Sequence, residues 1–256
     1  MKSPEILKRR RLLGIPFYTH KRLEERDLVL PVPEGELSYP GLLVLGRYWD
    51  GLVKDQEIPR KQDWVHLLIE TVSYSLLSLI WKGQVRVKAH HDKRIMIFGL
   101  LRTTTKSYSL HLGEAFHGGD LLGKRLYNAI EGLEKQPKYK NWMSALGTLV
   151  FKSFFGGQTM EEPARKLLEE ILMLYSKGYP WVRVESKRTA MLKSKVLQFH
   201  LAKGKGPELA EEYQRVKGWV EDYNESDVDF IQFIRAVSSS ITAEISMRVK
   251  STSTNP

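Results

Sequence analysis

The residues of this 256-residue chain best suited to chemistry are its seven histidines, two of which are adjacent. His90 and His91, followed by Asp92, have the donor types of a metal site. Neighbouring residues of an extended segment point to opposite faces, and no further His, Asp or Glu follows at a ligand spacing, so a solvated turn is predicted here. The chain has no cysteine, which excludes disulfides and thiolate metal sites. We expect no metal and no cofactor.

Motifs for a nucleophile or a phosphate loop are also missing. Serines 238–240 lack the Gly-x-Ser-x-Gly setting of a hydrolase, and Gly204-Lys205-Gly206 lacks the preceding strand and the spacing of a phosphate-binding loop. Adjacent acidic residues such as Glu169 and Glu170 are more typical of a solvent-exposed helix face than of a catalytic pair. The sequence therefore predicts a protein that is not an enzyme.

The charge is the unusual property of the composition. The chain carries 40 Lys and Arg against 30 Asp and Glu, a net charge of +10, which favours an anionic partner. A hydrophobic content of 42% is enough for a sizeable core. No signal peptide is predicted, and the apolar stretch 67–81 is shorter than the roughly 20 residues that cross a bilayer. We expect a cytoplasmic protein, peripheral on a membrane if it binds one.

Periodicity predicts a helix over residues 64–80, ended by Gly83. A strand over 85–88 and a partner strand over 94–98 would follow, with the turn at 90–93. Upstream, prolines and glycines between 31 and 46 predict loops, so residues 1–60 are interpreted as a basic, proline-containing N-terminal arm.

The same order recurs about a hundred residues later. Pro163 begins a helical pattern that ends at Lys177-Gly178, and Val182-Arg183-Val184 then repeats Val85-Arg86-Val87. We predict a mainly α fold with β-hairpins (α+β), in which duplicated helix-plus-hairpin, winged-helix-like units pack on a helical core. Chance recurrence of a common pattern is the alternative. The predicted limits are 61–206 for the core, 207–250 for acidic C-terminal helices and 251–256 for a disordered tail.

The positive charge is concentrated in three segments. Residues 1–26 hold eight Lys and Arg with three acids, and residues 82–106 and 183–205 each hold seven with one acid, whereas 206–233 hold two with eight acids. If the two units pack side by side, their hairpins form one basic surface. The alternative is that the Lys and Arg side chains only prevent the exposed edge strands from pairing with other chains. The residues predicted for this surface are Arg86, Lys88, Lys93, Arg94, Arg183, Lys187 and Arg188.

The order of short motifs between about residues 64 and 201 resembles the Golgi phosphoprotein 3 family and its bacterial relatives, which are peripheral membrane proteins that bind phosphatidylinositol 4-phosphate. Residues 76–85 (LLSLIWKGQV) are similar to the family's apolar helix that ends in a basic residue and glycine before a strand. Residues 119–122 (GDLL) and 141–146 (NWMSAL) are similar to two further helix openings, and 167–178 to the helix before a second hairpin.

The resemblance implies a lipid headgroup site. Its tryptophan would be Trp64, at the start of the first long helix, and its later cations would be Arg165 and Lys166. Where the family has an arginine within the first helix, this chain has Thr71 and Val72, which points to general binding of anionic surfaces. The implied function is that of a non-enzymatic, adaptor-like protein that binds an anionic membrane surface or phosphoinositide headgroups.

Two alternatives remain at this point. Helix, glycine and basic hairpin are also the order of a recognition helix and its wing, so the chain could be a tandem winged-helix protein that binds nucleic acid. The exposed positions of the first long helix include no arginine, which disfavours reading of the major groove. The other alternative is a structural subunit of a larger protein assembly, in which the basic hairpins and acidic helices contact other chains.

Overall fold

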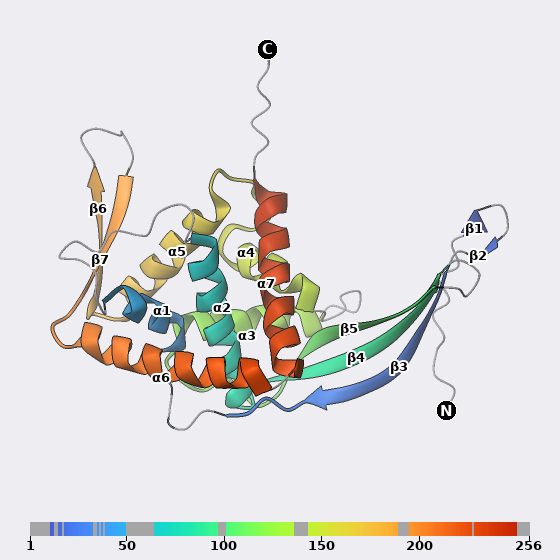
Figure 1. Cartoon of the computed structure of the whole chain (residues 1–256). Helices are drawn as coiled ribbons and strands as arrows, with labels where there is room; N and C mark the ends of the chain where they lie inside the picture. The colour runs from blue at the N-terminus through green and yellow to red at the C-terminus, as the bar shows by residue number, and fades with distance from the viewer. Residues whose placement is uncertain are drawn as a thin grey trace, which may run out of the picture.

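In a computed structural model, the chain folds into a body of helices with β-sheets that extend from it (Figure 1). The structure describes residues 11–12, 15–16, 18–32, 35, 37, 39–49, 64–96, 101–135, 143–188, 195–226 and 228–249. The helices are α1 (Pro40–Trp49), α2 (Trp64–Trp81), α3 (Leu121–Glu134), α4 (Leu146–Phe155), α5 (Pro163–Gly178), α6 (Lys205–Ser226) and α7 (Val228–Arg248), with a short 3-10 turn, η1 (Met143–Ala145), before α4. The strands are β1 (Arg11–Leu12), β2 (Ile15–Pro16), β3 (Tyr18–Leu28), β4 (Val85–Met96), β5 (Leu101–Leu112), β6 (Val182–Arg188) and β7 (Lys195–Leu201).

The α2 helix forms the centre of the body and contacts α1, α3, α5 and α7. Its residues 71–79 are all buried, in one core that the other helices share. By length and composition α2 could also cross a membrane, but 61% of that stretch is buried inside the protein, as in the central helix of a globular core. The mainly α fold with attached hairpins is thus confirmed.

The predicted repeat is present as a repeat of elements. The α2 helix leads into the β4–β5 hairpin, and α5 leads into the β6–β7 hairpin. The registers also match, since Arg86 lies opposite His111 in the first hairpin and Arg183 lies opposite His200 in the second. Gly83, with φ +69°, makes the turn from α2 into β4, as its position after the helix predicted.

The first hairpin is longer than predicted. The β4 strand runs through residues 90–93, which were expected to form the turn, and pairs with β5 from Val85–Leu112 to Met96–Leu101. The strand expected at 94–98 is therefore wrong. Residues 97–100 connect the two strands in sequence, and β3 adds to β4 as a third, antiparallel strand.

The interpretation of residues 1–60 as an arm is wrong for two of its parts. The β3 strand is part of the three-stranded sheet, and α1 belongs to the core, where Leu42, Leu43 and Val44 are fully buried. The α1 helix packs mainly against α6 and α2. Residues 1–10 and 250–256, which include the predicted tail, lie outside the described residues. The body therefore combines elements from all three predicted segments.

A glycine allows α1 to approach the rest of the core. A Cβ atom at Gly41 would lie 1.8 Å from Tyr175 Oη and 2.9 Å from Ser75 Oγ. The Tyr175 hydroxyl donates a hydrogen bond of 2.5 Å to Asp120 Oδ1, while Asp120 Oδ2 accepts from the Gly123 N–H at the start of α3. Asp120 is thus the N-cap of α3, and it is also buried.

Replacement of Asp120 by Asn is expected to change how stability depends on pH. Burial raises the pKa of Asp120 above its usual value of 3.8, and the hydrogen bonds from Tyr175 and Gly123 only partly offset this. A raised acid pKa gives stability at low pH that is lost as pH rises through the folded-state value. The free energy of unfolding of the Asn variant should therefore improve relative to the natural protein as pH increases from about 3.8. Urea unfolding at several pH values measures this difference, and a constant difference would contradict it.

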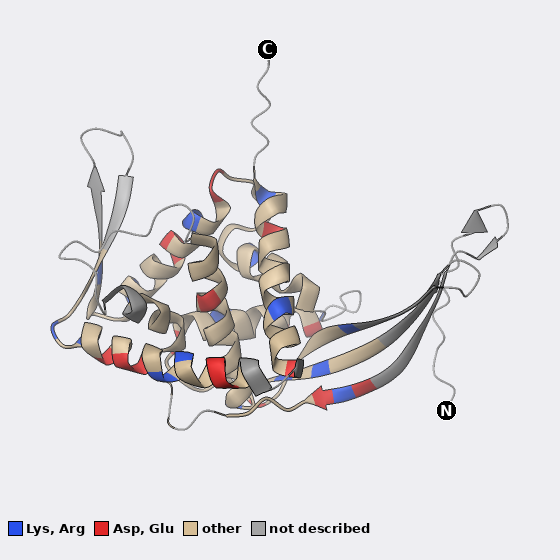
Figure 2. Cartoon of the chain, in the orientation of Figure 1, with Lys and Arg blue, Asp and Glu red and all other residues tan. Residues whose placement is uncertain are grey.

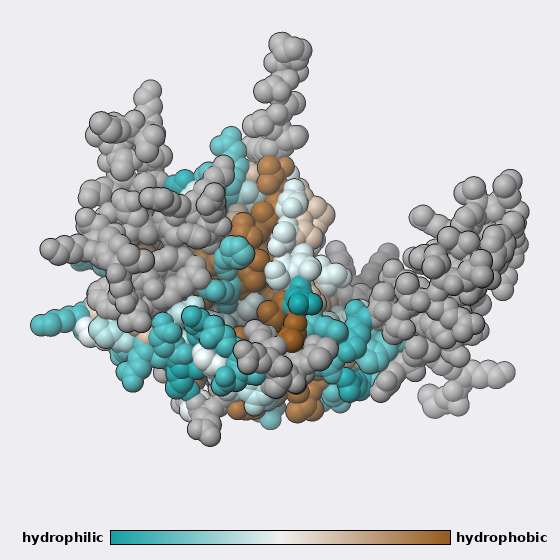
Figure 3. Space-filling view, viewed as in Figure 1, coloured by the Kyte–Doolittle hydropathy of each residue, from teal (hydrophilic) through white to brown (hydrophobic). Residues whose placement is uncertain are grey.

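The acidic C-terminal third forms two helices, as expected. Figure 2 shows acidic residues spaced along α6 among basic ones, on the underside of the body in this view. The α7 helix packs against α4, α2 and α6. Its outer side carries apolar surface (Figure 3), and near its end Met247 is 66% exposed.

Candidate functional site

The structure brings together two of the three residues of the implied headgroup site. Trp64 lies at the start of α2, and the Arg165 guanidinium on the first turn of α5 lies over its ring, 5.2 Å from the ring centre. Such a cation–π contact contributes about 0.5–1 kcal/mol at an exposed site. Lys166, the third residue, is 56% exposed. The proximity that the resemblance implied is therefore present.

The electrostatics of this site do not favour an anion. Arg165 forms ion pairs with Glu162 at 3.1 Å and Glu169 at 2.8 Å, and Lys166 lies 3.7 Å from the other oxygen of Glu169. Two carboxylates therefore accompany two cations. Thr71 and Val72, at the place of the family's arginine, are buried and offer no further charge. An anionic headgroup would have to compete with Glu162 and Glu169.

The residues predicted for the basic surface differ in their surroundings. Lys88 pairs with Glu25 of β3 at 3.0 Å, and the exposed Arg86 donates a hydrogen bond of 3.4 Å to the Leu112 carbonyl. Arg183 is exposed at the base of β6. For the other four the structure gives strand positions, with Lys93 opposite Thr104, Arg94 opposite Thr103, Lys187 opposite Val196 and Arg188 opposite Lys195.

The two basic hairpins do not form one surface. In Figure 1 the β6–β7 hairpin and the β3–β4–β5 sheet extend from different sides of the helical body. The condition for a single basic surface, that the two units pack with their hairpins adjacent, is therefore not met. Any anionic partner meets each basic hairpin separately.

The charged residues of the three-stranded sheet differ between the part near the helices and the part farther out. Near the helices, Arg26 and Lys106 both pair with Asp229 at the start of α7, and Asp229 consequently has a lowered pKa, caused first by the Lys106 hydrogen bond. Figure 2 shows this mixture of charges where the sheet leaves the body. Farther out, basic residues of neighbouring strands lie opposite one another or opposite histidine, since Lys21 is in register with Lys93 and His20 with Arg94.

The far end of this sheet has an apolar sequence between basic residues. Residues 95–101 read Ile-Met-Ile-Phe-Gly-Leu-Leu, and Arg94 and Arg102 flank them directly. The pairing of Met96 with Leu101 places residues 95–96 and 101 of this run at the end of the hairpin, away from the helices (Figure 1). The sequence prediction missed this feature because it placed the turn at 90–93.

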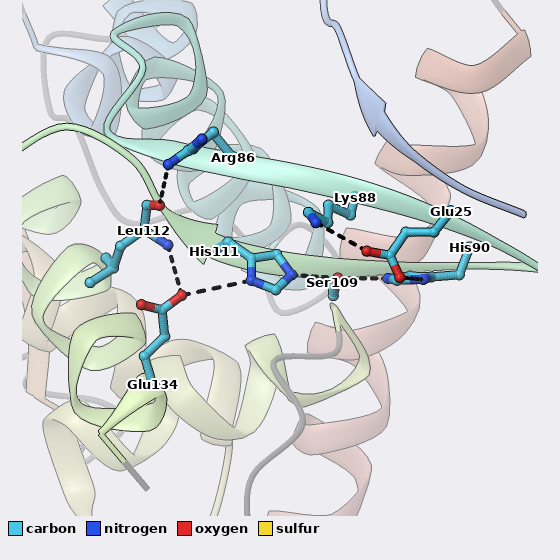
Figure 4. Close-up of polar contacts among 8 residues, drawn as sticks. All are labelled: Glu25, Arg86, Lys88, His90, Ser109, His111, Leu112 and Glu134. Atoms are coloured by element: carbon cyan, nitrogen blue, oxygen red, sulfur yellow. Dashed lines mark hydrogen bonds and ion pairs between the residues drawn. The ribbon is translucent and has the colours of Figure 1, made fainter. Parts of the chain in front are cut away.

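A second group of polar residues lies on one face of the sheet near the body (Figure 4). Ser109 Oγ lies 2.7 Å from Nε2 of His90 and 2.9 Å from Nε2 of His111. The Nδ1 atoms face carboxylates, with Glu25 at 3.4 Å from His90 and Glu134 at 3.8 Å from His111. These residues are Glu25, His90, Ser109, His111 and Glu134, which we call the polar chain. A signal for it was present in the alternation of Ser107, Ser109 and His111 along one strand.

The polar chain has the residue types of a Ser–His–Glu hydrolase site but not its accessibility. Ser109 and His90 are 5% and 3% exposed, in the middle of paired strands. A nucleophile must reach a substrate carbonyl and needs hydrogen-bond donors for the oxyanion. The buried hydroxyl of Ser109 is instead held between two imidazoles. Among the described residues, no group of three or more His, Asp and Glu is arranged to hold a metal ion.

Comparison of the chain with models of protein families, with curated proteins and with solved structures gives no match.

Proposed function

We propose that this protein is a non-enzymatic, peripheral membrane protein that binds anionic bilayers through the far end of the β3–β4–β5 sheet. The observation that carries the proposal is the end of the hairpin that extends from the body, where Met96 pairs with Leu101 beside Arg94 and Arg102, together with the apolar sequence that connects the two strands. A cytoplasmic leaflet, which is rich in anionic lipids, is the surface that this chemistry fits best.

The two parts of this end contribute to binding in different ways. A buried Phe or Leu side chain gains about 1.5–3 kcal/mol when it leaves water, so Phe98 in the lipid interface favours attachment. Each Lys or Arg near an anionic surface adds about 1 kcal/mol. An apolar anchor or a few basic residues alone give only marginal membrane binding, whereas the two together give stable attachment.

Vesicle co-sedimentation tests this proposal. The natural protein should pellet with vesicles of phosphatidylcholine and phosphatidylserine, and much less with phosphatidylcholine alone. Arg94→Ala with Arg102→Ala should weaken binding about 30-fold, because two contributions of about 1 kcal/mol are lost. Phe98→Asp should weaken it about tenfold or more, because an apolar contact is lost. Binding that is unchanged in both variants would overturn the proposal.

Control variants distinguish binding through the end of the sheet from binding through other surfaces of the protein. Met247→Asp places the same acid on an exposed apolar position of α7 and should leave binding unchanged. Trp64→Ala with Arg165→Ala removes the implied headgroup site, and vesicles containing phosphatidylinositol 4-phosphate show whether that site adds selectivity. If these two changes alone abolish binding, the membrane contact lies at α2 and α5 instead of at the sheet.

Nucleic acid is the competing partner for a basic end. A titration with random duplex DNA at about 50 mM salt, where phosphate contacts are strong, provides the comparison. Binding to DNA that falls steeply with salt and is unaffected by Phe98→Asp, with no binding to acidic vesicles, would replace the membrane proposal. Phosphate recognition gives no role to the apolar run 95–101.

A further inference from the structure

The β6–β7 hairpin ends in basic residues at the point where it is farthest from the helices (Figure 1). Its last two pairs of residues, three of which are basic, are Lys187 with Val196 and Arg188 with Lys195. We call these four residues the second end. The sequence that connects the two strands, residues 189–194, reads Thr-Ala-Met-Leu-Lys-Ser. The second end thus repeats the chemistry of the far end of the sheet, cations beside an apolar connecting sequence.

The second end is the weaker of the two as a membrane contact. Residues 95–101, at the far end of the sheet, contain six apolar residues and a glycine, whereas residues 189–194 contain three apolar residues and one lysine. The free energy of membrane attachment grows with the apolar area that leaves water. We therefore expect a single second end to bind a bilayer only marginally, so that the far end of the sheet dominates the affinity of one molecule.

The helical body fixes the direction in which each of these two structures extends. At the base of the second hairpin, Val182 and Phe199 are buried in the core that the helices share. At the base of the sheet, Val85 and Val87 are buried in the same core, and Asp229 of α7 forms ion pairs with β3 and β5. Neither the hairpin nor the sheet can turn towards the other without exposing apolar side chains.

These fixed directions differ, with the helical body between the two structures (Figure 1). At about 3.3 Å per residue, the 12 residues of β4 extend over about 40 Å and the 7 residues of β6 over about 23 Å. A hairpin whose end enters a bilayer lies along the normal of that surface, and a flat bilayer has only one normal. When the far end of the sheet enters one bilayer, the second end therefore remains available for another.

We propose that the protein bridges two anionic bilayers, with the far end of the sheet in one and the second end on the other. This inference rests on the proposed function, because the far end of the sheet supplies the stronger contact. Many copies attached to one bilayer present their second ends together, and many weak contacts in parallel hold the second bilayer. The apolar connecting sequence favours a bilayer over nucleic acid, because phosphate recognition gives it no role.

A pelleting assay with two populations of vesicles tests the inference. One population, of phosphatidylcholine and phosphatidylserine, is loaded with sucrose and pellets on centrifugation. The other has the same lipids, carries a fluorescent lipid and remains in the supernatant when it is alone. The natural protein should carry the fluorescent vesicles into the pellet with the loaded ones. Fluorescent vesicles of phosphatidylcholine alone should stay in the supernatant, because the second end depends on anionic lipid.

Arg188→Ala with Lys195→Ala should separate bridging from binding. The protein concentration for half-maximal transfer of fluorescent vesicles should rise about 30-fold or more, since two cations at the surface are lost. Binding to the loaded vesicles alone should stay within about twofold, because the far end of the sheet is intact. Arg183→Ala with Lys203→Ala is the matched control, which removes the same charge from exposed positions at the base of the hairpin. It should leave the transfer unchanged.

Each result bears on one of the two proposals. Transfer that is unchanged by Arg188→Ala with Lys195→Ala would overturn bridging, and so would a natural protein that pellets with loaded vesicles but carries no fluorescent ones; both results leave the proposed function intact. No pelleting with loaded vesicles would overturn both proposals. If the double variant does not fold, Lys187→Glu tests the same end with one substitution and should likewise abolish transfer. Loss of binding to random duplex DNA in place of transfer would assign this hairpin to nucleic acid and overturn bridging.

Discussion

Gly41→Ala is expected to destabilise the protein by about 3 kcal/mol or more, because the added methyl group has no space. It would lie 1.8 Å from Tyr175 Oη, and Tyr175 cannot move away without losing its hydrogen bond to the buried Asp120. Urea unfolding followed by circular dichroism measures the loss. The packing of α1 in the core thus requires a residue without a Cβ atom at position 41.

Two comparisons test this explanation. In a Tyr175→Phe background the hydroxyl is missing, so Gly41→Ala should cost less than in the natural protein, although Tyr175 Cζ at 2.8 Å still limits the recovery. Gly132→Ala, on α3 with no atom within 4 Å of the added group, should be neutral or stabilise by up to about 1 kcal/mol. Equal costs at Gly41 in both backgrounds would show that Tyr175 is not the cause.

Glu244→Ala is expected to destabilise the protein by about 3–5 kcal/mol, because it leaves a buried arginine without its carboxylate. Glu244 and Arg248 are each 5% exposed, and Arg248 Nε donates to Glu244 Oε1 at 2.5 Å. Glu244 also accepts from the Thr148 hydroxyl of α4 at 2.6 Å, and Arg248 donates to the Gln158 carbonyl. The pair therefore fixes the end of α7 to α4 and to the segment after it. The thermal midpoint and urea unfolding report the change.

Removing both charges should cost less than removing one. Glu244→Ala with Arg248→Met leaves no unpaired charge in the core, so its loss should be smaller than that of Glu244→Ala alone. The exposed pair of Glu131 and Lys135 is the control, and Glu131→Ala should cost no more than about 0.5 kcal/mol. A cost for Glu244→Ala as small as that for Glu131→Ala would contradict the importance of burial.

The helices with a regular apolar period could be predicted from the sequence, and those that depend on distant partners could not. The α2 helix has apolar residues at helical spacing and Gly83 after its end, and both features are local. In α1, Pro40 and Gly41 indicated a loop, and only the contact with Tyr175 explains why a glycine is needed there. The register of β4 was missed because the sheet extends beyond the helices, where no core imposes the alternation of apolar and polar residues.

The candidate sites show the same division. The proximity of Trp64 and Arg165 followed from a resemblance in the order of motifs, and the structure has it. The neutralising acids, Glu162 and Glu169, were visible in the sequence at helical spacings of three and four from Arg165, where ion pairs form. The polar chain could not be predicted, because Glu25 and Glu134 reach His90 and His111 only through β-pairing and helix packing.

The packing of α1 against α6 has a consequence for how the protein is made. These two helices lie at opposite ends of the chain, since α1 ends at Trp49 and α6 begins at Lys205. At a synthesis rate of about 5–20 residues per second, on the order of ten seconds or more pass between them on the ribosome. During this interval Leu42, Leu43 and Val44 cannot yet be covered by α6. The docking of α1 in its final place in the core must therefore follow the synthesis of α6, more than 150 residues later.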